Sequence, residues 1–562
     1  MGKRLFSAFL VLALGASMAF FAYRSGLTEE NTVSSSEASP AAGEASFSVA
    51  KDNGQTLTVW YADDALSEFL STEALAYQAQ TGTHIDLKQV SGVDYLEQIN
   101  TASVYDGETA QDGSVYEAPD LYLTTHDTLL RAYLAGLADP VRDPHQIMIA
   151  ENFPETSLHA VSCDGKYVAY PLYYETNFFL YNKTYMRDIA SAKVEADTDR
   201  AQGVAAQEAI DAEGGKPAED NKDADGKSGD DKAEEDKKQD EGDEKKEEDE
   251  SAAEDGEDAE EVPADEEEGD PMGEEDAQAS PEVLKQLSTM IPSTMDDIRN
   301  FANNYDAPEA VEAVFKWDVS DIFYNYFFVG NYMNVGGEDG DNNAIFNIYN
   351  KQAVECLSVY YDLNSFFSIE DEENTYDSIL QEFLDGKTVF TVATTDAVSK
   401  IEQAKLDGNF DFEYGISVLP DLSSTLKVRG LSVTTCMAVN GYSDNKDAAN
   451  DFASYLSFEK GQELYRKAGK ISCKRGCVYE NNEIYNIMNE YEKSVSLPKM
   501  VETADFWVQL EIAFSKILNG ADPDETLKAL SDKVGGSIES IDYHIPVQET
   551  IGAGAGTLLL PE

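Results

Sequence analysis

Histidine, tryptophan and cysteine are scarce in this sequence of 562 residues, and their scarcity excludes several kinds of chemistry. The five histidines form no His-Glu-x-x-His motif, and no Gly-x-Ser-x-Gly nucleophile elbow occurs. The five cysteines are too few and too scattered for a disulfide scaffold, although Cys473 and Cys477 in "CKRGC" are spaced to close a small loop. A zinc site would need two more ligands near them. We therefore predict no enzyme, no cofactor and no metal site.

Basic residues are also few. The sequence has 41 Lys and Arg against 108 Asp and Glu, which gives a formal net charge of −67. A field of this sign repels phosphate backbones and anionic lipid surfaces. The composition excludes nucleic acid as a partner and favours neutral or cationic ligands.

Much of the excess acid lies in one segment. Residues 191–280 contain 37 acidic and 10 basic residues, with few aromatic or β-branched ones. Such a segment cannot bury enough apolar surface to offset the entropy that it loses on ordering. We predict that residues 187–285 form a disordered acidic insertion, in which a helix would have no face to pack.

The beginning of the sequence contains a long apolar run. Lys3 and Arg4 precede the uncharged stretch from Leu5 to Tyr23, which is about long enough to cross a bilayer. Positive residues hold the leading end in the cytoplasm, so the following chain is expected outside the cell. We interpret residues 1–25 as a transmembrane anchor or a cleaved signal peptide, favour the anchor, and interpret residues 26–54 as a flexible tether. Since the first Cys is Cys163, lipoprotein anchoring is excluded.

Strand and helix patterns alternate past this tether. Strands are predicted at "TLTVWYA" (56–62), "THIDLKQV" (83–90) and "APDLYL" (118–123), with amphipathic helices between and after them. This alternation predicts a mainly parallel α/β sheet, in which ligands lie beyond the carboxyl ends of the strands.

One apolar run contains a single ionisable residue near its middle. "PLYYETNFFLYNK", from Pro171 to Lys183, has the composition of a buried strand but includes Glu175. An unpaired buried carboxylate costs several kcal/mol or takes up a proton. We expect Glu175 to have a partner, to reach water or to face a cavity.

Several motifs, in this order, carry a family resemblance: "PDLYL", "LLRAYLAGLADPV", "DGKYVAYPLYYETNFFLYNKTYM", "PSTMDDI", "FLDGKTVFTV", "YGISVLPD", "NKDAANDFASYLSFEKGQELY" and "DFWVQLEIAF". From about residue 55 to 535, apart from 187–285, the chain resembles the bacterial extracellular solute-binding proteins of ABC importers, family 1, the sugar-binding, maltose-binding-protein-like group. The resemblance implies a two-lobed type II periplasmic-binding-protein-like fold with a hinge. It also implies ligand binding without catalysis.

The resemblance predicts the extent of each lobe. Lobe 1 is expected to comprise residues 55–173 and 422–478. Lobe 2 is expected to comprise residues 174–421 and 479–545, with the acidic insertion inside it. Residues 546–562 are expected to form a separate C-terminal tail.

The resemblance also predicts ligand-binding residues. At the family's ligand-binding carboxylate positions stand Glu175, with Tyr174 beside it, and Asp127. A hinge salt bridge is the alternative for Glu175, and a helix cap is the alternative for Asp127. One of Asp63 and Asp64, at the end of the first strand, is expected to match an early polar contact of the family, although Asp64 equally suits a helix cap.

Aromatic residues complete the predicted site. Trp507 matches a tryptophan that stacks on sugar in the family, with core packing as its alternative. Trp317 and Tyr324 are weaker candidates. Where the family's maltose binders carry aromatics, this chain has Thr124, Thr395 and Asp396. The ligand is therefore expected to be a smaller or more polar sugar, or a molecule that bears a cation.

The predicted function is that of a membrane-tethered extracellular protein. It captures a monosaccharide or oligosaccharide between two lobes and delivers it, as a monomer, to the permease subunits of an ABC importer. The alternative is an anchored sugar sensor or surface-adhesion protein that uses the same lobes without transport.

Overall fold

The computed structural model describes residues 51–213, 279–367, 374–500 and 503–538. The strands are β1 Thr56–Tyr61, β2 His84–Gln89, β3 Leu121–Thr125, β4 Ser162–Cys163, β5 Lys166–Tyr167, β6 Tyr170–Asn182, β7 Ala313–Phe315, β8 Asn334–Val335, β9 Phe346–Asn347, β10 Thr388–Thr394, β11 Tyr414–Ser417, β12 Leu431–Val439 and β13 Val495–Ser496.

The helices are α2 Ser67–Thr81, α3 Tyr95–Val104, α4 Leu129–Leu134, α5 Glu155–Ala160, α6 Lys183–Glu213, α7 Pro281–Met290, α8 Met295–Asn304, α9 Lys351–Phe367, α10 Tyr376–Leu384, α11 Asp396–Leu406, α12 Lys446–Ser454, α13 Gly461–Ala468, α14 Glu483–Lys493, α15 Thr503–Leu518 and α16 Pro523–Ile538. Short helical turns are η1 Asp64–Leu66, η2 His126–Thr128, η4 Ile322–Tyr324, η5 Tyr326–Phe328 and η6 Tyr455–Glu459. None of the helices in the described ranges is both long and apolar enough to span a membrane. The predicted anchor, residues 26–50 of the predicted tether and the predicted tail lie outside those ranges.

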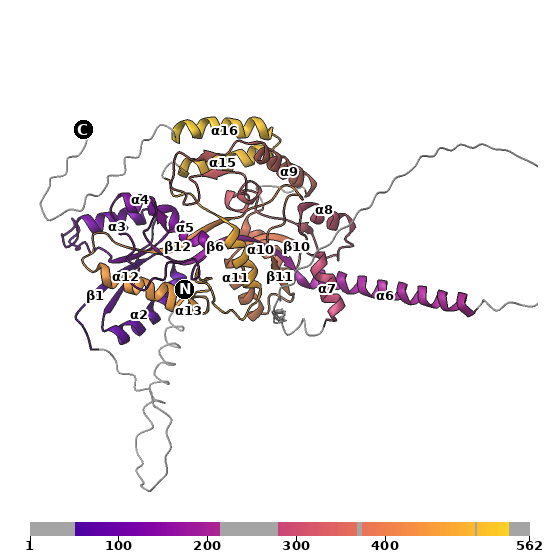
Figure 1. Cartoon of the computed structure of the whole chain (residues 1–562), viewed down its shortest axis with the longest axis horizontal. Helices are drawn as coiled ribbons and strands as arrows, with labels where there is room; N and C mark the ends of the chain where they lie inside the picture. Colours follow the sequence, from indigo (N-terminus) through magenta and orange to yellow (C-terminus); the bar gives the residue numbers. More distant parts are fainter. Residues whose placement is uncertain (1–50, 214–278, 368–373, 501–502, 539–562) are drawn as a thin grey trace, which may run out of the picture. The chain divides into compact units, whose positions relative to one another are not determined.

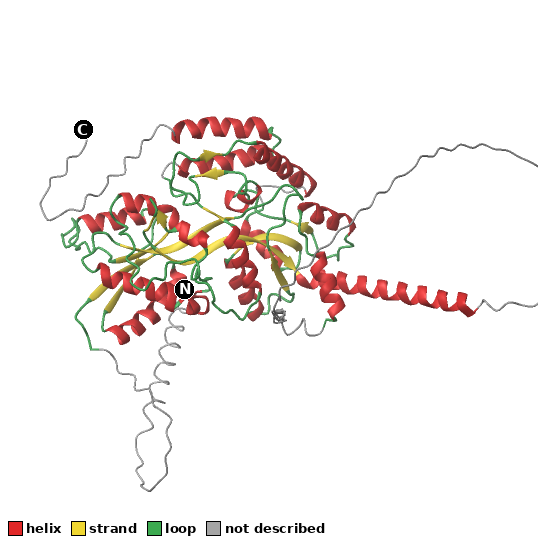
Figure 2. Cartoon of the chain, in the orientation of Figure 1, coloured by secondary structure: helices red, strands yellow, loops and turns green. Residues whose placement is uncertain are grey.

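The main sheet has the order β2-β1-β3-β12-β6-β10-β7, with β11 added beside β6 and β13 beside β12. Strands β1, β2 and β3 pair in parallel, as the alternation of strands and helices predicts. Helices cover the strands on both sides (Figures 1 and 2). The predicted strands at 56–62, 83–90 and 118–123 are confirmed by β1, β2 and β3.

Strand β6 belongs to both ends of this sheet. Its residues up to Thr176 pair with β12, whereas its residues from Asn177 onward pair with β10 and then also with β11. We call β1, β2, β3, β12, β13 and the start of β6 the first half of the sheet. The second half comprises the end of β6, β7, β10 and β11. The partner of β6 therefore changes between Thr176 and Asn177.

Two hydrophobic cores pack against the sheet. Phe178 belongs to the core that includes Leu57 and Leu121, while the next residue, Phe179, belongs to the core that includes Phe315 and Phe390. Successive residues of a strand point to opposite faces, so β6 contributes to both cores. Its side chains are buried throughout except at Glu175.

The predicted disordered insertion is corrected at both of its ends. The first residues of α6 pack against α7, where Met186, Ala190 and Leu287 are buried in the second core. Residues 187–213 and 279–285 are therefore structured. The apolar side chains at 186, 190 and 287 are too widely spaced among charged residues to stand out in the sequence. Residues 214–278 lie outside the described ranges.

Helix α14 holds the segment that leads from β11 back to β12. Glu483 accepts a hydrogen bond from the Ile416 amide at 2.7 Å, and Asn486 donates to the Ile416 carbonyl at 2.9 Å. One turn later, Glu490 accepts from the Leu419 amide at 3.2 Å. The positions i, i+3 and i+7 share one face of a helix, so a single row of side chains on α14 bonds to the backbone of β11 and of the residues just after it.

Glu490 is 3% exposed. Burial raises its pKa to about 7, although the Leu419 amide and Lys493 oppose the shift. The folded state then holds a proton that the unfolded state releases near pH 4.5, so Glu490 lowers stability as pH rises from about 4.5 to 7.

We predict that Glu490→Gln gains stability relative to the wild type by roughly 2–3 kcal/mol between pH 5 and pH 8, because an amide needs no proton to stay neutral. Urea unfolding at both pH values measures this change. Glu483→Gln controls for the loss of one charge from α14. A Glu490→Gln effect that is equal at the two pH values would contradict the prediction.

Candidate ligand-binding site

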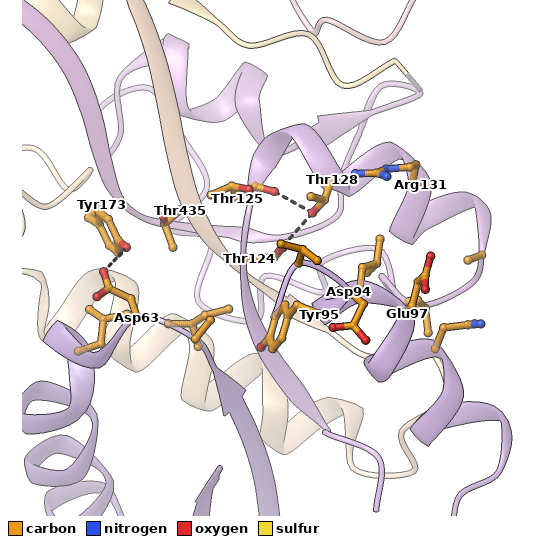
Figure 3. Close-up of a pocket in the computed structure, with 18 residues that line it drawn as sticks. Asp63, Asp94, Tyr95, Glu97, Thr124, Thr125, Thr128, Arg131, Tyr173 and Thr435 are labelled. Carbon is orange, nitrogen blue, oxygen red and sulfur yellow. Dashed lines mark hydrogen bonds between the residues drawn. The ribbon is translucent and has the colours of Figure 1, made fainter. Parts of the chain in front are cut away.

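A cavity of about 540 Å³ lies at the carboxyl ends of β1 and β3 (Figure 3). Its volume is within the range of about 300–1,000 Å³ that is usual for small-molecule sites. Asp63 and Tyr173 lie at one end of it, and Asp94, Glu97 and Arg131 lie at the other (Figure 3). This is the edge of a parallel sheet where the sequence predicts a ligand.

Asp63 is held in place by a small polar cluster. Its Oδ1 accepts a hydrogen bond from the Ala65 amide at 3.0 Å, which caps η1. Its Oδ2 accepts from the Tyr173 hydroxyl at 3.0 Å and lies 3.1 Å from Lys470 Nζ. Lys470 Nζ also lies 3.4 Å from Glu175 Oε1. One lysine therefore joins the predicted carboxylates Asp63 and Glu175.

The two carboxylates differ in how much of their hydrogen-bonding capacity is used. Burial alone raises the pKa of Asp63, but Lys470, the Ala65 amide and Tyr173 outweigh burial and leave the pKa below its ordinary value. Glu175 has a side chain that is 42% exposed, and among the described residues its one polar contact is a long one, at 3.4 Å, to Lys470. Glu175 is thus salt-bridged, as its alternative predicts, and partly exposed to solvent. It is not among the residues that line the cavity, so ligand contact at Glu175 stays a prediction.

The second half of the sheet carries a matching cluster at the carboxyl end of β10. Asp396 accepts a hydrogen bond from the Tyr376 hydroxyl at 2.7 Å and lies 2.7 Å from Lys400 Nζ. Tyr376 stacks on Tyr324, with ring centroids 4.8 Å apart. The acid that replaces a family aromatic at Asp396 is therefore already paired.

Two contacts bring the second cluster close to β6 and to Lys470. The Thr395 hydroxyl donates to the Tyr174 carbonyl at 3.5 Å. A Cβ on Gly469 would lie 3.4 Å from the Ser399 side chain. The first turn of α11 therefore packs beside β6 and beside the residue that precedes Lys470.

Asp127 follows a buried histidine that ties three segments together. His126 Nδ1 accepts from the Thr434 amide at 3.0 Å, so its Nε2 donates to the Leu497 carbonyl at 2.9 Å. Burial, with Lys499 nearby, lowers the pKa of His126 to about 4 and keeps the ring neutral. Asp127 itself is half-buried and caps neither η2 nor α4. The cap alternative is therefore not what the structure shows, and ligand contact at Asp127 stays a prediction.

The contacts of two more predicted site residues, Tyr174 and Asp64, are made within the protein. Tyr174 is 2% exposed and stacks on Tyr491 with ring centroids 3.7 Å apart, so its side chain is part of the core and not of a ligand surface. This corrects its assignment, because the alternation of β6 turns residue 174 inward when residue 175 faces outward. Asp64 is not the cap of η1, which is Asp63. Asp64 accepts from Ser67 and Gln89 at 3.4 and 3.3 Å.

The two predicted tryptophans, Trp317 and Trp507, differ in how deeply they are buried. Trp317 is fully buried and donates to Asn325 Oδ1 at 2.9 Å, so it packs in the core, the role expected to outweigh ligand contact. Trp507 is half-buried at the edge of the second core, with its ring edge-on to Tyr326 at 5.1 Å. Sugar stacking at Trp507 stays a prediction.

Lys470, Lys400 and Tyr376 contact acidic residues that we singled out from the sequence, but these three were not themselves predicted. Each lies far along the chain from the acid that it contacts, except for Lys400, which follows Asp396 by one helical turn. That i, i+4 spacing was a usable signal. No local pattern marks Lys470 as the partner of Asp63.

Comparisons with known proteins define the fold. No protein-family model matches the chain. The maltodextrin-binding protein MdxE of Bacillus subtilis is 21% identical over 260 residues, a match that covers 43% of this chain and 60% of that protein. An extracellular solute-binding protein of Staphylococcus aureus, solved with maltose, superposes with a TM-score of 0.59 and 16% identity over 87% of this chain and 99% of that one.

A cyclo/maltodextrin-binding protein solved with maltotetraose gives a TM-score of 0.58 at 14% identity, covering 87% of this chain and 98% of that one. The maltose-binding protein MalE of Listeria monocytogenes, solved with maltose, gives 0.56 at 14% identity, covering 87% and 99%. The chain has the fold of the type II solute-binding proteins. The resemblance inferred from the motifs is confirmed, and these proteins are named for binding, not for catalysis.

We predict that Asp63→Ala lowers the free energy of unfolding by about 1–3 kcal/mol at pH 7, because it removes a cap and a partly buried charged hydrogen bond. Asp64→Ala, on the neighbouring carboxylate, should change it by less than about 0.5 kcal/mol. Since the pKa of Asp63 is lowered by folding, its contribution is present above about pH 4 and is lost as pH falls through the folded pKa. Urea unfolding from pH 3 to 7 measures both variants; equal losses would contradict the assignment.

Proposed function

We propose that this solute-binding fold captures a neutral carbohydrate and delivers it to an ABC importer from the extracellular side. One observation carries the proposal: Glu175 is the accessible residue of an otherwise buried strand, next to the point where that strand changes partners. Its Oε2 takes part in none of the described hydrogen bonds. A carboxylate oxygen there is hydrated in an open site and can accept from sugar hydroxyls in a closed one.

The hinge follows from the pairing of β6. Rotation between Thr176 and Asn177 would move β10 and β11 relative to β12 without breaking either ladder. A ligand that touches both halves only in the closed form stabilises that form. The lobe boundaries at 173/174, 421/422 and 478/479 stay proposals. The first lies within β6, three residues before the change of partner, and the second lies within the β11–β12 connection.

The names of the similar proteins support the ligand class and the location. Three of them are called maltose- or maltodextrin-binding, and one is called extracellular. With Thr124 and Thr395 in place of aromatics, the ligand is proposed to be smaller or more polar than a maltodextrin. Membrane tethering, the permease partner and the monomeric state are proposed with the same function. A sensor would use the same site and differ only in its membrane partner.

The test is calorimetry with a panel of neutral mono- and oligosaccharides. We predict micromolar affinity, about −8 kcal/mol, for at least one of them. Glu175→Gln should weaken it at least tenfold, because a hydrogen bond to a charged group contributes about 1.5–3 kcal/mol. Trp507→Ala should also weaken it through loss of ring contact.

Glu355→Gln is the matched control, since Glu355 is exposed and pairs with Lys351 on α9, at 3.0 Å. Retention of full affinity by the double variant Glu175→Gln, Trp507→Ala would remove the site assignment. A panel without any binder would remove the carbohydrate assignment itself.

A further inference from the structure

The carboxylates at the site share an arrangement that itself resembles a cation-binding site. Lys470 Nζ lies 5.0 Å from the centre of the Tyr173 ring while it contacts Asp63 and Glu175. An ammonium over an aromatic face and between two carboxylates is how proteins recognise amine ligands. Here the ammonium belongs to the protein.

The second half repeats this arrangement. Lys400 Nζ lies 5.1 Å from the centre of the Tyr376 ring, 2.7 Å from Asp396 and 3.2 Å from Asp377. Each half therefore places one lysine, one tyrosine and two carboxylates together. In both halves, a lysine of the protein occupies the place between the carboxylates and the aromatic ring.

We propose that Lys470 is a specificity-determining residue, which makes the site select a neutral polyhydroxy ligand by occupying the position that a ligand ammonium would take. This inference rests on the proposed function and names the class of ligand that the site refuses. It decides between the two ligand classes that the sequence left open, a polar sugar and a molecule that bears a cation.

The position of Lys470 is fixed by the chain on its N-terminal side. Helix α13 ends at Ala468, and Gly469 adopts the left-handed conformation with φ of +64°, donating its amide to the Tyr465 carbonyl at 2.7 Å. That conformation suits glycine, whereas a Cβ at this position would make only ordinary contact with the Ser399 side chain, at 3.4 Å. The lysine side chain is 19% exposed, so it reaches Asp63 and Glu175 from a partly buried position.

The negative net charge of the protein makes an internal cation at the position of Lys470 useful. With a net charge of −67, the chain attracts cations from solution. Without Lys470, Asp63 and Glu175 would face a tyrosine ring as two unneutralised carboxylates. A polyamine or an amino sugar would then be favoured over a neutral sugar.

The test uses two disaccharides of similar size: maltose, which is neutral, and the disaccharide of chitosan, which carries two amines. Binding to the full chain is measured by calorimetry at pH 6, where the amines are protonated. The wild type should prefer maltose at least tenfold. Lys470→Met, which keeps the length of the side chain, should bind the chitosan disaccharide at least tenfold more tightly than the wild type does.

Lys470→Arg should retain the wild-type preference, because it keeps the charge. Lys351→Met, on the exposed face of α9, controls for the general effect of removing one positive charge. A purely structural lysine would change both affinities together or neither, so a Lys470→Met variant without the gain for the chitosan disaccharide overturns the proposal.

The outcome separates the two proposals. If the wild type fails to bind maltose and every other neutral sugar, the proposed function fails, and the gain of Lys470→Met for the cationic disaccharide still decides this inference. If Lys470→Met does not fold, the wild type decides it, since equal affinity for both disaccharides overturns the proposal.

Discussion

The structure depends on one strand serving two sets of neighbours. The first residues of β6 pair with β12, with an irregularity at Leu172, and its later residues pair with β10 and β11. Because a buried strand cannot leave its amides unpaired, the change of partner is confined to one peptide step. That step fixes where the two halves meet and where bending costs fewest hydrogen bonds.

Polar side chains hydrogen-bond to backbone groups near this change of partner. Glu483, Asn486 and Glu490 of α14 satisfy the backbone of the β11–β12 connection, and His126 links η2 to β12 and to the segment after β13. These contacts join segments that are distant in sequence. They hold the connections between the halves in defined positions while the ladders on either side remain intact.

The charge balance of the site differs from that of the whole chain. The protein is strongly acidic, yet Asp63, Glu175 and Asp396 each lie beside a lysine. A carboxylate that is neutralised nearby still accepts hydrogen bonds from hydroxyl groups, but it no longer favours a ligand cation. In the proposed function, this neutralisation lets carboxylates serve sugar recognition within an acidic protein.

The prediction of Glu175 was possible from the sequence because a lone acid in an aromatic run violates the usual pattern of a buried strand. Tyr174 was assigned wrongly by proximity, since adjacent residues of a strand face opposite ways. The packing of α6 on α7 was missed because a highly charged composition concealed the few apolar side chains that meet there.

The sequence by itself predicted the first strands, their alternation with helices and the family of folds, because periodicity and turn residues act locally along the chain. It did not predict that β12 pairs antiparallel with β3 and β6, or that β6 pairs antiparallel with β10 and β11. Tertiary structure alone decided that Lys470 meets Asp63 and Glu175, and that β6 changes partners after Thr176. Those features join residues that are far apart in the sequence; Asp63 and Lys470, for example, are 407 positions apart. No local pattern encodes these contacts, since they form only when both halves of the sheet have paired with β6.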